Sequence, residues 1–254
     1  MAISKSWKKI VSDFKILGHD FDNSPFPLSA SQIKKSVQKF KSTGEKEVRI
    51  LCKQDTREQR PQVFINNDLF LLPVRNGLYN IIKGEGYIDI PKIKSQVEIY
   101  KSKLSFELES SKIGNSEMQH VDYAYATSLL RTFMNDESLV LTIRGRKYTP
   151  EFSFFVNKQK IEVASVQTEV DGGYEGKNQI VLVEAKSSGS KNVIIRQLYY
   201  PFRQWQSNTN KKVYTLFFEK DNRAKTYSFW QFEFTEIENY NSIKLSRSAI
   251  FKII

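Results

Sequence analysis

Two charged residues lie at the end of a stretch that is otherwise fit for a protein core. The stretch QIVLVEAK, residues 179–186, is aliphatic until it reaches Glu184 and Lys186. Because side chains alternate along a strand, both charges share one face with Ile180 and Leu182. Buried charges without a partner are costly. The two residues therefore either form an ion pair with each other or belong to a polar site at the rim of a sheet.

A further carboxylate, Asp171, precedes Glu184 by thirteen residues in the stretch VQTEVDGGYEG. Gly172 and Gly173 follow it and predict a tight reversal, so that a hairpin would bring Asp171 beside Glu184. Carboxylates hold hard divalent cations, which stabilise charge on a phosphodiester and lower the pKa of a water molecule. A lysine can orient or deprotonate that water and offset developing negative charge. The three residue types therefore favour metal-assisted hydrolysis.

The stretch EVDGGYEGKNQIVLVEAK resembles the core of the PD-(D/E)xK nuclease superfamily, which includes restriction endonucleases. The resemblance covers roughly residues 115–235. It implies that Asp171, Glu184 and the carbonyl group of Ala185 hold Mg²⁺, and that Lys186 is the catalytic helper. Val170 occupies the place of the proline in the superfamily's name, a position that varies among members.

The resemblance also implies supporting residues around the metal. Members often add a carboxylate from the first helix of the core, for which Glu117 and Asp122 are candidates. Glu169 shares a strand face with Asp171 and is a further choice. A polar residue, often glutamine, supports the site from the helix after the (D/E)xK strand, and Gln197 fits that role.

The net charge of +11, from 39 Lys and Arg against 28 Asp and Glu, favours a polyanionic partner such as double-stranded DNA. Residues 1–100 hold 17 of these basic residues against 11 acidic ones. The alternative is a basic surface that only maintains solubility. The side chains expected to contact DNA are Lys34, Lys35, Lys39, Arg57, Arg60, Arg144, Arg146 and Arg196. Each is equally compatible with a solvated surface or loop.

The single cysteine, Cys52, excludes an internal disulfide and any site with several cysteine ligands. Only two histidines are present, far apart in the sequence, which argues against zinc. The longest apolar runs are much shorter than the roughly 18 residues that a membrane span needs. The first residues have no apolar signal segment, so we expect a cytoplasmic protein.

The N-terminal residues 1–95 are expected to form a DNA-recognition domain of α+β type. Ser29 and Gln32 predict a capping box, and Leu28 with Ile33 a hydrophobic staple, at the start of a basic helix that Gly44 can end. Strands are expected over residues 47–53, 61–66, 68–74 and 78–84, with a tight turn at residues 75–77. Two helices followed by a hairpin fit a winged-helix module, and also many other small α+β domains.

Residues 96–254 are expected to form the catalytic domain, an α/β fold with a mixed sheet. Helices are expected over residues 117–136 and 192–206, the second kinked or interrupted by Pro201. Arg203 on this helix is a further candidate for phosphate contact. Its aromatic residues Tyr199, Phe202 and Trp205 are expected in the core. Strands are expected over residues 138–145, 152–157, 160–170, 179–185, 212–220 and 226–234.

Together these features predict a Mg²⁺-dependent, sequence-specific DNA endonuclease similar to a restriction enzyme. A repair or junction-resolving nuclease is one alternative. A DNA-binding module with a nuclease-like core that no longer cuts is another. Many such enzymes are homodimers because a two-fold symmetric DNA site needs two active sites, and a monomer that nicks is the alternative.

Overall fold

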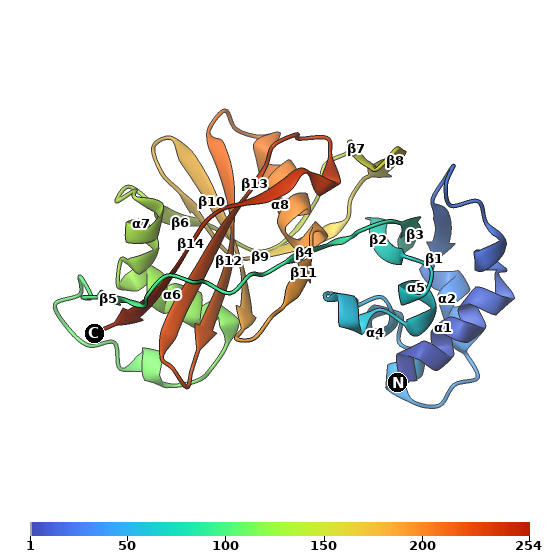
Figure 1. Cartoon of the computed structure of the whole chain (residues 1–254), viewed down its shortest axis with the longest axis horizontal. Helices are drawn as coiled ribbons and strands as arrows, with labels where there is room; N and C mark the ends of the chain where they lie inside the picture. Colours follow the sequence, from blue (N-terminus) through green and yellow to red (C-terminus); the bar gives the residue numbers. More distant parts are fainter. Residues whose placement is uncertain (1) are drawn as a thin grey trace.

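The computed structural model describes residues 2–254 and has two lobes, an N-terminal one and a larger one built on a broad sheet (Figure 1). The elements of the N-terminal lobe are α1 (Ala2–Asp13), η1 (Ile16–Gly18), β1 (Phe26–Ser29), α2 (Ala30–Val37), α3 (Thr43–Lys46), α4 (Val48–Leu51), η2 (Arg57–Gln59), α5 (Gln62–Ile65), β2 (Leu69–Arg75) and β3 (Leu78–Lys83).

The N-terminal lobe is a helical layer packed on a small antiparallel sheet with strand order β1-β3-β2. Its core gathers Trp7, Ile33 and Leu51 with apolar side chains of β2 and β3. The predicted capping box is confirmed: the Ser29 hydroxyl accepts from the Gln32 N–H at 3.2 Å, and the Gln32 side chain accepts from the Ser29 N–H. The expected turn at residues 75–77 joins β2 to β3.

Two strands expected in this lobe are wrong. Residues 48–51 and 62–65 form the short helices α4 and α5. Tertiary packing decides against the local β propensity, because helical turns bury Leu51 and Phe64 against Trp7. The helix α2 also ends at Val37, well before Gly44, where α3 has already begun.

The larger lobe begins with β4 (Tyr87–Asp89) and β5 (Glu98–Tyr100) and continues to the last described residues. Its other elements are η3 (Ser110–Lys112), α6 (Glu117–Ala126), α7 (Leu129–Met134), β6 (Val140–Tyr148), β7 (Phe152–Val156), β8 (Gln159–Val163), β9 (Gln167–Glu175), β10 (Gln179–Ser187), β11 (Asn192–Ile194), α8 (Arg196–Gln206), β12 (Lys212–Asp221), β13 (Thr226–Phe234), η4 (Tyr240–Ser242) and β14 (Ile243–Ile253).

The main sheet has seven strands in the order β5-β14-β13-β12-β10-β9-β6. Strands β10 and β12 run parallel to each other and are connected through α8. Strands β14 and β5 at one edge are also parallel, whereas the other neighbouring strands are antiparallel. The predicted α/β class with a mixed sheet is therefore confirmed. The strand β14 has no counterpart in the sequence prediction.

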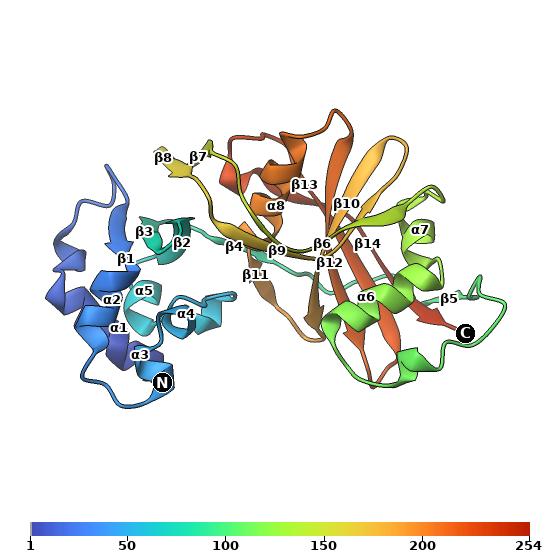
Figure 2. The same ribbon diagram turned by 180° about the vertical axis from the view of Figure 1, so that it is seen from behind.

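Helices cover both faces of this sheet, as Figures 1 and 2 show from opposite sides. Val181, Val183 and Ala185 point toward α6 and α7 and join their apolar residues in one core. Ile180 and Leu182 point the other way and pack with α8. The predicted alternation along β10 is confirmed, and it sets Glu184 and Lys186 on the α8 face.

Several boundaries in the larger lobe differ from the prediction. The helix expected over residues 117–136 breaks at Thr127, whose hydroxyl donates back to the Tyr123 carbonyl, and Ser128 adopts a φ of 64°. The single strand expected over residues 160–170 is divided between β8 and β9. Residues 192–194 are the strand β11, which pairs with β4, and α8 runs through Pro201 without interruption.

The predicted reversal at Gly172 and Gly173 is wrong. Strand β9 continues through both glycines, and the turn into β10 lies at residues 176–178. A Cβ atom at Gly173 would approach the Cβ of Ile143 on β6 to 2.5 Å. The glycine therefore permits close approach of two strands instead of a turn.

No helix in the described part of the chain, residues 2–254, is long and apolar enough to cross a membrane.

Candidate functional site

The antiparallel pairing of β9 and β10 brings Asp171 and Glu184 together. Gly172 lies opposite Val183. Because the strands are antiparallel, the neighbours of these residues, Asp171 on β9 and Glu184 on β10, also lie opposite each other. Asp171 Oδ2 accepts a hydrogen bond from the Ala185 N–H at 2.8 Å. The two carboxylates thus converge although the turn that joins their strands lies at residues 176–178 and not at Gly172 and Gly173.

Glu184 is the more deeply buried carboxylate, with 8% of its surface exposed. Burial raises its pKa to about 7, and the neighbouring Asp171 charge adds to this, while the Lys186 ammonium opposes it. Lys186 forms an ion pair with Glu184 Oε1. Burial lowers the pKa of Lys186, but the negative charges of Glu184, Asp171 and Glu117 together raise it by more. Lys186 is therefore a cation at neutral pH.

Burial also raises the pKa of Asp171, and neither the Ala185 N–H nor the Lys186 charge fully offsets it. Negative charge from Glu117 and Glu169 raises it further. Carboxylates that are hard to ionise and lie beside one another are the electrostatic arrangement that a bound cation relieves.

Glu117 at the start of α6 belongs to the same site. Its Oε1 accepts from the Ser187 N–H at 2.9 Å, directly after Lys186. The other helix candidate, Asp122, instead forms an ion pair with Arg144. The sequence did not distinguish Glu117 from Asp122 as the additional carboxylate. The packing of α6 on β10 places Glu117 at the site and Asp122 beside Arg144.

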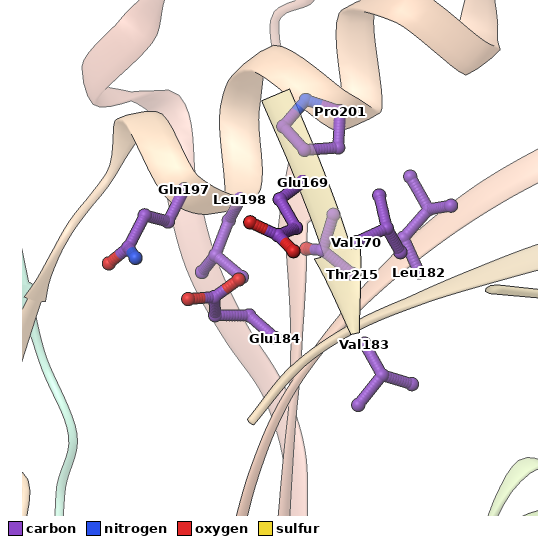
Figure 3. A pocket seen from close by; sticks show the side chains of 9 residues that line it. All are labelled: Glu169, Val170, Leu182, Val183, Glu184, Gln197, Leu198, Pro201 and Thr215. Atoms are coloured by element: carbon purple, nitrogen blue, oxygen red, sulfur yellow. The ribbon is translucent and has the colours of Figure 1, made fainter. Parts of the chain in front are cut away.

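Gln197 lies at the start of α8, over a small cavity that Glu184, Glu169 and Thr215 also line (Figure 3). The cavity measures about 10 Å³, room for one water molecule. The Gln197 Oε1 atom is buried without a hydrogen-bond partner in the described part of the chain. Buried polar atoms are rarely left unpaired, so this oxygen is available to a ligand or to water.

Sequence reasoning missed Glu219 on β12, the register partner of Lys186. Its carboxylate is 7% exposed and accepts from the backbone N–H groups of Gly189 and Ser190, at 3.2 and 2.9 Å. Glu219 thereby fixes the loop that follows β10. A buried glutamate within the apolar run KVYTLFFEK was the available signal.

A cleft of about 990 Å³ lies between the two lobes. The wall formed by the larger lobe, which we call the acidic wall, carries four carboxylates and two cations: Glu117, Glu169, Asp171, Glu184, Lys186 and Arg196. The N-terminal wall carries three cations, which we call the cleft-wall cations, Arg49, Lys53 and Arg75, against the single carboxylate of Asp55. The cleft therefore has one mainly acidic and one mainly basic wall.

The arginines predicted to contact DNA are mostly engaged within the protein. Arg57 pairs with Glu85 and Asp89, and Arg60 donates to the Leu69 carbonyl. Arg60 therefore stabilises the N-terminal lobe, whereas Arg57 links that lobe to β4 of the larger lobe.

Arg144 and Arg146 pair with carboxylates of the larger lobe, Arg146 with Glu169 at 3.4 Å. Of the predicted arginines, Arg196 alone lines the cleft, 3.8 Å from Asp55 Oδ1. Arg203 is bound to the Ser153 and Ile237 carbonyls, and Tyr199 and Phe202 are core residues as expected.

Lys34, Lys35 and Lys39, on and just after α2, are exposed but do not line the cleft. The structure therefore gathers the predicted residues Glu117, Glu169, Asp171, Glu184, Lys186, Arg196 and Gln197 around one cleft, with the Ala185 N–H bonded to Asp171. The predicted residues outside the cleft are Lys34, Lys35, Lys39, Arg57, Arg60, Asp122, Arg144 and Arg146.

Among residues 2–254, no three His, Cys, Asp or Glu side chains cluster closely enough to hold a metal ion by themselves. The oxygen donors that could hold one are two carboxylates, Asp171 and Glu184, with the Ala185 carbonyl. The unpartnered Gln197 oxygen is a further donor. Such a set suits a hard divalent cation and lacks the soft ligands that zinc or copper prefers.

The fold and site define an α/β protein with a mixed sheet and an acidic, lysine-containing cleft. A family model described as Domain of unknown function (DUF6997) matches residues 82–252, and the chain belongs to this family. A second model, Domain of unknown function (DUF6996), matches residues 4–81. The domain boundary expected near residue 95 stays a prediction. Comparison with curated proteins and with solved structures gave no match.

Proposed function

We propose that the chain is a Mg²⁺-dependent, sequence-specific DNA endonuclease similar to a restriction enzyme. The observation that carries the proposal is the meeting of Asp171, Glu184 and Lys186 at a cleft between two lobes. Two carboxylates and a lysine that meet on neighbouring strands are the arrangement that the PD-(D/E)xK resemblance implies.

The order of elements supports the same reading. From α6 the chain passes through β6, β9 and β10, then α8, then β12, with β7–β8 and β11 inserted. The neighbouring strands follow the order β6-β9-β10-β12. Helix, three strands, helix and strand is the order of an α/β fold with a mixed sheet, on which the resemblance to the nuclease core depends. The N-terminal lobe supports a winged-helix module by its order of elements, which is α1, β1, α2, the short helices and the β2–β3 hairpin. Its sheet has the strand order β1-β3-β2.

Asp171, Glu184 and the Ala185 carbonyl would hold the metal ion, and Gln197 would complete the donor set. The raised pKa values of both carboxylates and the unpartnered Gln197 oxygen support this fit. The ion supplies charge stabilisation on the phosphodiester and a lowered pKa for a water molecule.

The protein's own groups divide the remaining work. Lys186 can orient the attacking water or take a proton from it, and its charge can offset negative charge at the phosphate. Glu117 and Glu219 hold the backbone on both sides of the loop after Lys186. They thereby limit movement of the strand end that carries it.

The two walls of the cleft support a nucleic acid as substrate. A phosphate backbone is attracted by the cleft-wall cations, and it would be repelled by the acidic wall unless a cation neutralised that wall. The net charge of +11 acts in the same direction over longer distances. The charge pattern therefore links binding of DNA to binding of the metal.

The Lys186–Glu184 ion pair supports a second candidate, a DNA-binding module that does not cut. In that reading the lysine only neutralises a buried carboxylate. The two readings predict different results when the protein is incubated with DNA and Mg²⁺.

The test is incubation of supercoiled plasmid with the full chain and MgCl₂. Discrete fragments support a restriction-type enzyme, nicked circles alone support a monomer that nicks, and cutting confined to branched DNA supports a junction-resolving enzyme. Binding without cleavage would support the second candidate. Asp171→Asn and Glu184→Gln should abolish cleavage while retaining DNA binding in Ca²⁺. Wild-type cleavage by either variant would contradict the metal-site assignment.

A further inference from the structure

The two lobes are joined by a shared hydrophobic core. On β2, the side chains of Leu69 and Leu71 belong to the core of the N-terminal lobe. Phe70 and Leu72, on the opposite face, pack in the same cluster as Tyr200 of α8. A strand whose two faces belong to two cores cannot move with one lobe alone. The walls of the cleft are therefore held at a fixed separation.

Hydrogen bonds between the lobes reinforce this connection. The Ile194 N–H donates to the Asp55 carbonyl at 2.8 Å, the Ala164 N–H to the Val74 carbonyl at 3.0 Å, and the Tyr200 hydroxyl to the Pro73 carbonyl at 3.0 Å. Two of these bonds lie near the tip of the β2–β3 hairpin, and the third lies two residues before Arg196. They anchor the N-terminal wall directly to α8, to β11 and to the segment before β9 in the larger lobe.

The N-terminal wall presents side chains suited to reading bases. Arg49, Arg75 and Asn76 are exposed and line the cleft, Asn76 at the tip of the β2–β3 hairpin. Within residues 2–254, no hydrogen bond or ion pair engages their side chains, in contrast to Arg57 and Arg60. Arginine binds guanine and asparagine binds adenine through paired hydrogen bonds in the major groove. These residue types, free and directed at a cleft, are those of a sequence-reading surface.

The distance between this surface and the catalytic residues follows from the chain itself. Ala164 contacts Val74, beside the hairpin tip, and Asp171 lies seven residues further along. At about 3.3 Å per residue, the separation is at most roughly 23 Å. The gap between Ala164 and Val74, the step to Arg75 and the reach of an arginine side chain bring this upper limit to roughly the length of one turn of B-DNA, about 34 Å.

We propose that one cleft serves both recognition and cleavage, with Arg49, Arg75 and Asn76 reading bases within one helical turn of the phosphate that is cut. The inference rests on the proposed nuclease function and adds to it the specificity-determining residues and the position of the cut. A rigid connection excludes cleavage at a remote site, which needs a catalytic domain on a flexible tether.

The experiment has two stages and uses the full chain. First, duplexes are selected from a randomised DNA library by binding in CaCl₂. The selected duplexes are then treated with MgCl₂, and the cut is mapped relative to the shared sequence. We expect a cut inside that sequence or within one helical turn of it. A cut further away would overturn the inference, as would non-specific cleavage with no selected sequence. A selected sequence that is never cut would overturn the proposed function and leave the recognition surface supported.

Variants identify the reading residues. Arg75→Ala and Asn76→Ala should each reduce preference for the correct base at one position by on the order of tenfold. Matched controls are Arg223→Ala and Asn178→Ala, exposed residues of the same types in turns outside the cleft. Unchanged preferences in both cleft variants, or equal loss in the controls, would overturn the assignment.

Discussion

The raised pKa of Glu184 predicts that protons and divalent cations compete for the site. With a pKa of about 7, Glu184 is mostly protonated at pH 6 and mostly ionised at pH 8. A cation that binds only the ionised form should therefore bind about tenfold more tightly at pH 8 than at pH 6. Near pH 7 each bound ion should release about half a proton.

The stability of the metal-free protein should also depend on pH, and the raised pKa of Glu184 fixes the direction of that dependence. A carboxyl group whose pKa rises from 4.5 to about 7 on folding binds more protons in the folded state. Its contribution is fully present below pH 4.5 and is lost as pH rises through 7, by roughly 3 kcal/mol at most. Added cation should restore stability on the alkaline side and have little effect near pH 5.

Calorimetric titration with CaCl₂, in buffers of different ionisation enthalpy, measures both affinity and proton release without cleavage. Glu184→Gln should bind weakly and lose the pH dependence. Glu162→Gln, an exposed carboxylate paired with Lys160 on the β7–β8 hairpin, is the matched control and should behave like wild type. Equal wild-type affinity at pH 6 and pH 8 would refute the reasoning.

Two further predictions concern the cations. Lys186→Met should leave the fold and Ca²⁺ binding intact, while the rate of single-turnover cleavage falls by on the order of 10² or more. A structural ion pair would give the opposite result. The variant would then melt much earlier, because a stranded buried charge costs about 3–5 kcal/mol, yet it would cut normally when folded. Lys53→Ala, which removes the cleft-wall cation that is not assigned to a base, should reduce the salt dependence of DNA binding by about 0.9 log unit. Replacement of Lys34, Lys35 and Lys39 by alanine should leave the salt dependence nearly unchanged, because these lysines do not line the cleft. Equal effects would show that the cleft is not the main DNA-binding surface.

The face of β10 on which Glu184 and Lys186 lie could be predicted because the alternation of side chains along a strand is a local property. The aliphatic run of β10 requires two buried faces, and the register of its charges follows from spacing alone. The capping box of α2 was predictable for the same reason, since it depends on residues three positions apart.

Features set by distant contacts could not be predicted. The glycines after Asp171 have the composition of a turn, but the approach of Ile143 on β6 decides their conformation. The strand β11 exists because β4 lies beside it, about a hundred residues earlier in the chain. Val48 and Ile50 favour a strand locally, yet packing against Trp7 makes their segment helical.

The ion-pair partners of the arginines could not be predicted from the sequence for a similar reason. Arg57 has the residue type of a DNA contact, but its carboxylate partners Glu85 and Asp89 follow about thirty residues later and meet it only in the fold. Conversely, Arg75 and Asn76 looked like ordinary turn residues. Their position at the cleft depends on how the lobes pack.

The central claim is that this cleft cuts DNA at a defined sequence with the help of Asp171. The most direct measurement is sequencing of the fragment ends after genomic DNA is digested by the protein with MgCl₂. We predict that the ends share one short sequence at a constant offset, and that Asp171→Asn protein yields no such ends. An absence of new ends from the wild-type protein, or the same ends from the variant, would contradict the account.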